Sequence, residues 1–255
     1  SKNSKMVYIF SGIMPTGKIV PKYQRLIHNI FVNPFEFLKN TSDFLLLKFY
    51  EKFKIINPFE LEFVTGDIGI LKNSHSKKVV PINFFDYDHY KQLEFSKDVI
   101  VDYKFILFID HNAPYHSDSL VLVDDEKYFK SINRVLGLIE EAQNLKIVIA
   151  ANPKSKYGSE KYEGREFYRL MTPELTREAE CVIIPYASSA VSYAVLSAKS
   201  ILFIYNDELM RTSAFSVSEQ VHIAQYLNLK VYNSDLITHG NQLIFRRPSE
   251  ERCDA

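Results

Sequence analysis

The clearest pattern in the chain is an alternation of short apolar runs with amphipathic stretches from residue 105 onward. Short, continuously apolar runs are typical of strands buried on both faces of a parallel sheet. The stretches between them repeat apolar residues at three-and-four spacing, as in Phe129, Ile132 and Leu136, which is typical of a helix with one buried face. The pattern predicts strands at 105–109, 146–150, 182–184, 201–205 and 229–232, and helices at 127–143, 173–179, 189–198 and 217–227. Regular alternation of this kind predicts an α/β fold with a parallel, doubly wound sheet.

The first part of the chain has a weaker pattern of the same type. Apolar runs predict strands over Met6–Phe10, Leu61–Thr65 and Val79–Phe84, and helical spacing predicts helices over Lys22–Phe31 and Thr41–Phe53. We therefore expect a smaller α/β domain at 1–103 and a larger one at 104–245. The charged residues 246–255 lack periodicity and are predicted to form a frayed tail.

Composition narrows the class of protein. The 255 residues carry 31 basic and 31 acidic side chains, so no overall positive field draws the chain to nucleic acid. Two cysteines, Cys181 and Cys253, are too few for a disulfide framework, and Cys181 is predicted to be a core residue. No apolar run approaches the roughly 20 residues of a membrane-spanning helix, and the N-terminus lacks a secretory pattern. We expect a cytoplasmic protein with no transmembrane segment, whose contact with the inner membrane is at most peripheral.

The densest local signal is a single strand–turn–helix–strand unit at residues 180–205. Its strand at 182–184 is followed by a turn of small residues that contains Ser188 and Ser189, and a helix follows directly. At a helix N-terminus the free backbone N–H groups and the helix dipole favour an anion, and two hydroxyls add further donors for a phosphate. The alternative interpretation is that Ser188 only caps the helix.

Two other predicted strands also end in polar loops. The strand at 105–109 is followed by four ionisable residues, Asp110, His111, His116 and Asp118. The strand at 146–150 ends in a polar turn made by Asn152, Pro153 and Lys154. Because ligands bind at the carboxyl ends of the strands in open α/β sheets, we expect these loops and the serine turn to converge on one site.

Several common kinds of site are missing from the sequence. It has no glycine-rich phosphate loop and no Gly-x-Gly-x-x-Gly, which argues against kinases and ordinary NAD enzymes. It has no cysteine cluster and no paired-histidine spacing, so we expect neither a structural metal nor a metal cofactor. A divalent ion held by the Asp and His loop at 110–118 is the alternative that this pattern leaves open.

Four blocks of sequence carry a resemblance to a known family. They are Asp86-Tyr-Asp88, Phe108-Ile-Asp-His-Asn-Ala-Pro-Tyr-His-Ser-Asp118, Ile147-Val-Ile-Ala-Ala-Asn-Pro-Lys154 and Tyr186-Ala-Ser-Ser-Ala-Val-Ser-Tyr-Ala-Val-Leu196. In order and spacing they resemble GT-B glycosyltransferases of the sialyltransferase-like kind, which build bacterial capsule and lipopolysaccharide. The resemblance covers roughly residues 80 to 210. It implies a GT-B-like fold of two Rossmann-like units, with the activated sugar on the C-terminal unit and the acceptor against the N-terminal one.

The resemblance also implies roles for particular residues. The donor would be a nucleotide sugar, such as a CMP-linked nonulosonic acid or a Kdo-like sugar, and the acceptor a surface glycan. The residues that the resemblance implies bind the donor are Asn152, Pro153, Lys154, Tyr186, Ser188, Ser189 and Asp207. The catalytic candidates are Asp110 as the first choice for the base, then Asp118, His111 and His116. Asp86 and Asp88 would orient the acceptor, although acidic residues after a strand also form turns.

Two departures from the family pattern keep alternatives open. Asn152 and Tyr186 stand where the family commonly has histidine, and an asparagine cannot give up a proton near pH 7. A catalytically weakened or inactive homologue that binds nucleotides or serves as a scaffold is therefore one alternative. A sugar-nucleotide epimerase of GT-B shape is another. Asp207 has a local alternative as well, because it can equally cap the helix that follows it.

Overall fold

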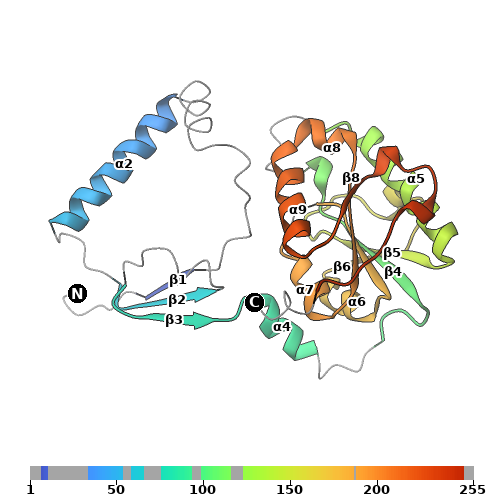
Figure 1. Ribbon diagram of the computed structural model, residues 1–255, viewed down its shortest axis with the longest axis horizontal. Helices are drawn as coiled ribbons and strands as arrows, with labels where there is room; N and C mark the ends of the chain where they lie inside the picture. The colour runs from blue at the N-terminus through green and yellow to red at the C-terminus, as the bar shows by residue number, and fades with distance from the viewer. Residues whose placement is uncertain are drawn as a thin grey trace. The chain divides into compact units, whose positions relative to one another are not determined.

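The computed structural model of the chain describes residues 7–10, 34–53, 59–65, 76–93, 99–115, 123–186 and 188–249. Its elements are shown in Figure 1. The contacts divide the chain into two compact units, one formed by residues 1–13 and 17–83 and the other by 14–16 and 84–255. All pairings between the named strands are parallel, so the predicted α/β class is confirmed.

The smaller unit contains a three-stranded sheet with the order β1-β2-β3. The three predicted strands are present as β1 (Val7–Phe10), β2 (Leu61–Thr65) and β3 (Val79–Ile82). Helix α2 (Pro34–Lys52) begins earlier than predicted, with a proline at its first position, where a missing backbone N–H does no harm. The helix predicted at Lys22–Phe31 lies outside the described residues.

The larger unit contains a six-stranded sheet with the order β6-β5-β4-β7-β8-β9. Along the chain, the sheet is built outward from β4 to β6 and then outward again, on the other side of β4, from β7 to β9. This is the strand order of doubly wound, Rossmann-like sheets, and the doubly wound prediction is confirmed. The strands are β4 (Phe105–Ile109), β5 (Lys146–Ala151), β6 (Phe167–Arg169), β7 (Cys181–Ile184), β8 (Ser200–Tyr205) and β9 (Val231–Asn233).

The helices of this unit include two that the sequence pattern did not predict, α4 (Phe85–Leu93) and α8 (Asp207–Thr212). Helix α7 (Val191–Leu196) is shorter than predicted, and α9 (Ala214–Tyr226) begins earlier. The other two are α5 (Asp125–Gln143) and α6 (Thr172–Glu178). Short 3-10 turns lie at Ala113–Tyr115, Ser159–Tyr162, Ser234–Leu236 and Gly240–Gln242.

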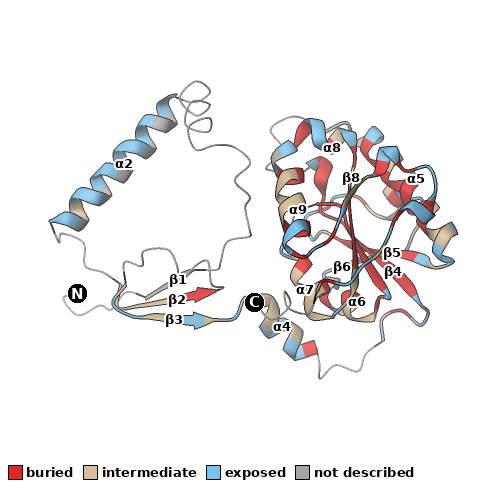
Figure 2. Ribbon diagram, in the orientation of Figure 1, coloured by how far each residue is buried: buried red, intermediate tan, exposed pale blue. Residues whose placement is uncertain are grey.

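The core explains the continuous apolar runs. The central strands of the larger unit are buried on both faces, as Figure 2 shows. Alternate residues of β4 enter two clusters, with Ile106 and Phe108 in one and Phe105 and Leu107 in the other. Cys181 is buried too, and burial raises the pKa of its thiol to about 12. It is therefore an unreactive core residue, as the sequence predicted.

The boundary between the units falls between Asn83 and Phe84, earlier than the predicted position near residue 103. Helix α4 belongs to the larger unit, where it contacts α6 and α7. Ser192 Oγ of α7 donates a hydrogen bond to Asp86 Oδ2 at 2.5 Å, and Arg177 of α6 donates to the backbone carbonyl of Leu93. These polar contacts attach α4 to helices that follow it by many residues.

Residues 246–255 were predicted to form a frayed tail, but the structure pairs the first of them, Arg246, with the large sheet. The backbone of Arg246 forms an antiparallel bridge with Ile201 of β8, with N–O distances of 2.8 and 3.3 Å. Residue 246 is therefore held by the sheet. Residues 250–255 lie outside the described part of the chain.

A close approach between the 240–242 turn and α5 can be tested by substitution. A Cβ added to Gly240 would lie 2.1 Å from the carbonyl oxygen of Leu138 and 2.6 Å from Cβ of Ala142. We expect Gly240→Ala to lower the free energy of unfolding by roughly 2 kcal/mol or more. Gly137→Ala, within α5, is the control, because its nearest neighbour is 4.0 Å away, and it should raise stability by up to about 1 kcal/mol. Equal denaturation midpoints for the two variants would contradict the packing.

Candidate functional site

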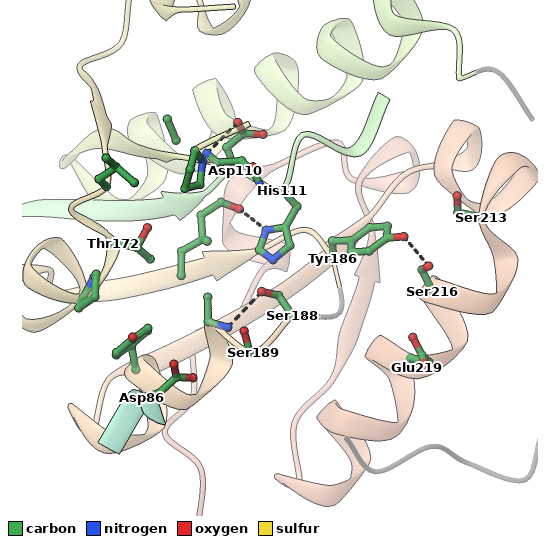
Figure 3. A pocket seen from close by; sticks show the side chains of 18 of the residues that line it. Asp86, Asp110, His111, Thr172, Tyr186, Ser188, Ser189, Ser213, Ser216 and Glu219 are labelled. Atoms are coloured by element: carbon green, nitrogen blue, oxygen red, sulfur yellow. Dashed lines mark hydrogen bonds between the residues drawn. The ribbon is translucent and has the colours of Figure 1, made fainter. Parts of the chain in front are cut away.

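A cleft of about 1110 Å³ lies in the larger unit at the carboxyl ends of its central strands. The three loops that the sequence analysis expected to converge, after β4, β5 and β7, all line it. Strand order reverses between β4 and β7, and that reversal is where open α/β sheets bind ligands. Figure 3 shows the cleft with its side chains. The remaining lining comes from α4, from Leu170 after β6, from the start of α6, and from α7 to α9.

Most of the residues predicted for the site meet in this cleft. Those that line it are Asp86, Asp110, His111, Asn152, Pro153, Tyr186, Ser188 and Ser189. His116 and Asp118 lie outside the described residues. Asp88 and Lys154 are exposed and are not among the lining residues.

Asp207 has a different position from the one its proposed donor-binding role needs. It is the first residue of α8, after the N-cap Asn206, and its Oδ1 accepts a hydrogen bond from Asn233 Nδ2 at 2.6 Å. It lines a smaller hollow of about 400 Å³ beside α5 and is not among the residues that line the main cleft, although Arg211 lines both. The geometry therefore favours a structural role for Asp207 in the first turn of α8, where an acidic side chain stabilises the helix, over a role in donor binding.

His111 lines the cleft between the loops that follow β5 and β7. Strand β4 pairs Ile109 with Ala150 of β5, so the same register continued brings His111 level with Asn152. On its other side β4 pairs Phe108 with Ile183 of β7, which brings His111 level with Tyr186. The rings of His111 and Tyr186 lie with their centroids 5.8 Å apart, and Figure 3 shows them beside each other.

Asp110 is buried, with 2 % of its surface exposed, and its carboxylate accepts from five donors. The donors come from its own loop and from the segment after β5. They are the backbone N–H of Asn112 at 2.9 Å and of Asn152 at 3.4 Å, Ser155 Oγ at 2.8 Å, and the hydroxyls of Tyr157 and Tyr162 at 2.9 Å each. A substrate hydroxyl would have to compete with these donors for the same oxygens. The carboxylate joins the ends of two neighbouring strands.

The two tyrosines that bind Asp110 are held in their neutral form. Burial raises the pKa of Tyr162 well above its ordinary value, and the negative charge of Asp110 raises it further. The pKa of Tyr157 is raised by the same two causes in the same order. Both hydroxyls therefore remain hydrogen-bond donors across the physiological pH range.

The serine turn is closed by local hydrogen bonds and also faces the cleft. Ser188 Oγ accepts a hydrogen bond from the backbone N–H of Ala190 at 3.0 Å, and Ser192 Oγ lies 2.5 Å from the carbonyl oxygen of Ser189. The N-cap residue of α7 is Ala190, with no side-chain cap hydrogen bond, so Ser188 closes a local turn ahead of the helix and does not cap it. Helix α7 has only six residues, so its dipole is small, and the hydroxyls of Ser188 and Ser189 are the stronger feature for a ligand.

Two groups of cleft residues were not foreseen. On one side, His89 of α4 and Tyr193 of α7 have ring centroids 6.1 Å apart, and Tyr193 OH lies 3.4 Å from His89 Nδ1. Sequence analysis missed this pair because it did not predict α4, although Asp86 at its start and Lys91 at its end are typical of helix termini. On the other side, α8 and the first turns of α9 contribute Arg211, Thr212, Ser213, Ala214, Ser216 and Glu219.

The described residues include no cluster of three or more His, Cys, Asp or Glu side chains placed to hold a metal ion. Among the helices that the structure describes, none has the length and apolar character needed to cross a bilayer. Comparison with protein-family models, with curated proteins and with solved structures finds no match to this chain. What defines the protein is its Rossmann-like sheet and the cleft at the reversal of strand order.

The tyrosines around Asp110 provide a matched test of the buried network. Tyr162 and Tyr128 both have no exposed surface; Tyr162 OH donates to Asp110, whereas Tyr128 OH has no hydrogen-bond partner among the described residues. Tyr162→Phe should lower the free energy of unfolding by about 1.5–3 kcal/mol, because it removes a hydrogen bond to a charged group. Tyr128→Phe should leave stability unchanged or raise it by roughly 1 kcal/mol. Urea denaturation measures both, and equal losses would contradict the network.

Proposed function

We propose that this protein is a glycosyltransferase that moves a sugar from a nucleotide-activated donor to a bacterial surface glycan. The observation that carries the proposal is the meeting of the resemblance residues in one cleft at the reversal of strand order. Asp86, His111, Asn152 and Ser188 come from four segments that are far apart in the sequence, and all four line the cleft. A shared GT-B ancestry is one explanation for blocks of sequence that converge on a single ligand-sized hollow.

The donor phosphate would lie against the hydroxyl groups of the cleft. Ser188 and Ser189 offer donors on one side, and Ser213 and Ser216 lie at the start of α9 on the other. Asn152 Oδ1 accepts from the backbone N–H of Lys154 at 2.9 Å, which leaves its amide NH₂ to face an anion. Hydroxyl and amide donors of this kind stabilise the charge that a departing phosphate develops, without a metal ion.

The charge of the lining favours a donor with few phosphates. Three carboxylates line the cleft, those of Asp86, Asp110 and Glu219, and Arg211 is its one permanent cation among the described residues. Arg211 is itself paired with Glu208 at 2.5 Å. A nucleoside monophosphate sugar, such as a CMP-linked nonulosonic acid, brings less negative charge into such a cleft than a diphosphate donor does. We place the reaction in the cytoplasm, with the glycan acceptor approaching on the side of Asp86.

A nucleotide-binding protein without turnover is the second candidate. The observation that favours it is the state of Asp110, whose two oxygens are already engaged by five donors. A carboxylate held in this way is well suited to a structural role. The two candidates share the ligand and differ in whether the cleft can accept a proton from the acceptor.

A thermal-shift screen with CMP, CDP, UDP, GDP and NAD tests the nucleotide site that both candidates require. CMP at a hundredfold excess over its Kd should raise the melting temperature by about 5 °C, because it binds only the folded state. The shift should be lost in the Ser188→Ala, Ser189→Ala double variant. It should persist in Ser197→Ala, at the other end of α7 and outside the lining. A wild-type protein that none of the five ligands stabilises would rule out the proposed donor site.

A further inference from the structure

We infer that Leu170 is the residue against which the base of the bound nucleotide packs, with Pro153 beside it. The nucleotide is that of the proposed function, on which this assignment rests, because it places one part of the donor in one part of the cleft. Three features of the described residues support it. They are the position of Leu170, the exposure of its side chain and the conformation of its backbone.

The position is the end of the strand that lies beyond Asn152. Leu170 follows β6 directly and lines the cleft. Strand β5 pairs Ala151 with Arg169 of β6, so the same register continued brings Leu170 level with Asn152. In the sheet order β6 lies three strands from β7, which precedes the serine turn, or roughly 14 Å away at the usual strand spacing. A nucleotide whose phosphate lies near the serine turn and Asn152 therefore extends toward Leu170.

The lining changes in character from one end of the cleft to the other. Among the described residues, the ends of β5 and β6 and the start of α6 contribute only uncharged ones, which are Ala151, Asn152, Pro153, Leu170, Thr172 and Pro173. At the other end α8 and α9 contribute Arg211, Glu219 and three hydroxyl groups. Figure 3 shows Thr172 and Glu219 on opposite sides of His111. A sugar with a carboxylate and many hydroxyls needs the polar end, whereas a flat base suits the uncharged one.

The side chain of Leu170 is available to a ligand. It is 75 % exposed, and Pro153, on the neighbouring strand end, is exposed as well. A single exposed leucine is ordinary on a protein surface, but this one lies within the lining of a cleft. Covering its apolar surface with the face of a base removes that surface from water, which favours binding in proportion to the area covered.

The backbone of Leu170 is held in an unfavourable conformation. Its φ is 59°, in the left-handed region that a residue with a Cβ avoids and that glycine adopts readily. Its neighbours fix this conformation, because Arg169 Nη1 donates to the carbonyl of Ser155 at 2.6 Å and the carbonyl of Met171 accepts from the N–H of Leu175 at 3.0 Å. Strained residues of this kind cluster at ligand sites. Stability alone favours glycine here, so we attribute the leucine to its contact with the base.

Leu170→Gly separates the contact with the base from the stability of the fold. The variant loses the apolar side chain and the strain together. Its Kd for CMP should therefore rise about 5–20-fold, while its own melting temperature should stay level or rise by up to about 4 °C. Isothermal titration calorimetry and thermal denaturation measure the two quantities. An unchanged Kd for CMP would overturn the inference, and so would a fall in melting temperature, because the leucine would then support the fold.

Ala198→Gly is the matched control. Ala198 is also exposed and has a φ of 49°, and it follows α7 outside the lining of the cleft. The control should show the same small change in melting temperature with an unchanged Kd for CMP. Leu170→Met keeps the apolar volume and should bind CMP within about threefold of wild type. A loss in Leu170→Met as large as that in Leu170→Gly would contradict an apolar contact.

Leucine methyl NMR shows which part of the nucleotide lies on the residue. In protein with ¹³C-labelled leucine methyl groups, the signals of Leu170 are those that Leu170→Gly lacks. CMP should shift them upfield, because methyl protons over the face of an aromatic ring are shielded, and ribose 5-phosphate should leave them in place. Equal shifts with the two ligands would put the ribose or the phosphate at Leu170 and would overturn the inference.

Failure of the proposed function has a different signature. If none of the five screened nucleotides stabilises wild-type protein, the donor site is ruled out and the base contact falls with it. If wild-type protein binds CMP and Leu170→Gly binds it equally well, the donor site stands and the base contact alone is overturned. A protein that binds CMP through Leu170 but transfers no sugar would support the inference and favour the second candidate function, a nucleotide-binding protein without turnover.

Discussion

The arrangement of the loops in the larger unit depends on the hydrogen bonds that stabilise one buried carboxylate, that of Asp110. Asp110 follows the central strand, where water is excluded, and an isolated charge there would be costly. Five donors compensate it, and they come from the loop after β4, from the turn after β5 and from the 159–162 segment. Each of these segments also borders or supports the cleft. The interaction that makes the charge tolerable is therefore the same one that fixes the cleft floor.

The fold was largely predictable because the central strands are buried on both faces. Complete burial requires continuous apolar runs, and all five runs predicted after residue 104 became strands of the larger sheet. Strand β6 was missed because it has three half-exposed or exposed residues and no run to detect. Helix α8 was missed because its six residues include two acidic and one basic side chain and contain no apolar repeat. Helix α4 has a polar sequence whose helical state depends on contacts with α6 and α7.

The site was predictable in its location and less so in its interactions. Loops that follow neighbouring parallel strands must meet at one edge of the sheet, so the meeting of Asp110, Asn152 and Ser188 followed from their positions in the sequence. The partners of Asp110 did not follow. Tyr157 and Tyr162 lie in a stretch without periodicity, and nothing local indicates that their hydroxyls point at a carboxylate more than 45 residues earlier. His89 was likewise hidden, because its proximity to Tyr193 depends on packing between α4 and α7.

The lining of the cleft runs from Asp86 to Glu219 and takes residues from nearly every loop at one end of the sheet. In the unfolded chain these residues are separated by long stretches, and pairing between distant parallel strands is a slow step in folding. No partial sheet contains the whole lining. A molecule that fits the cleft therefore recognises only the completed unit, and its binding energy opposes each local opening that would separate α4, the β4 loop or the start of α9 from the rest. Ligand binding at the cleft is therefore thermodynamically coupled to the folding of the whole larger unit.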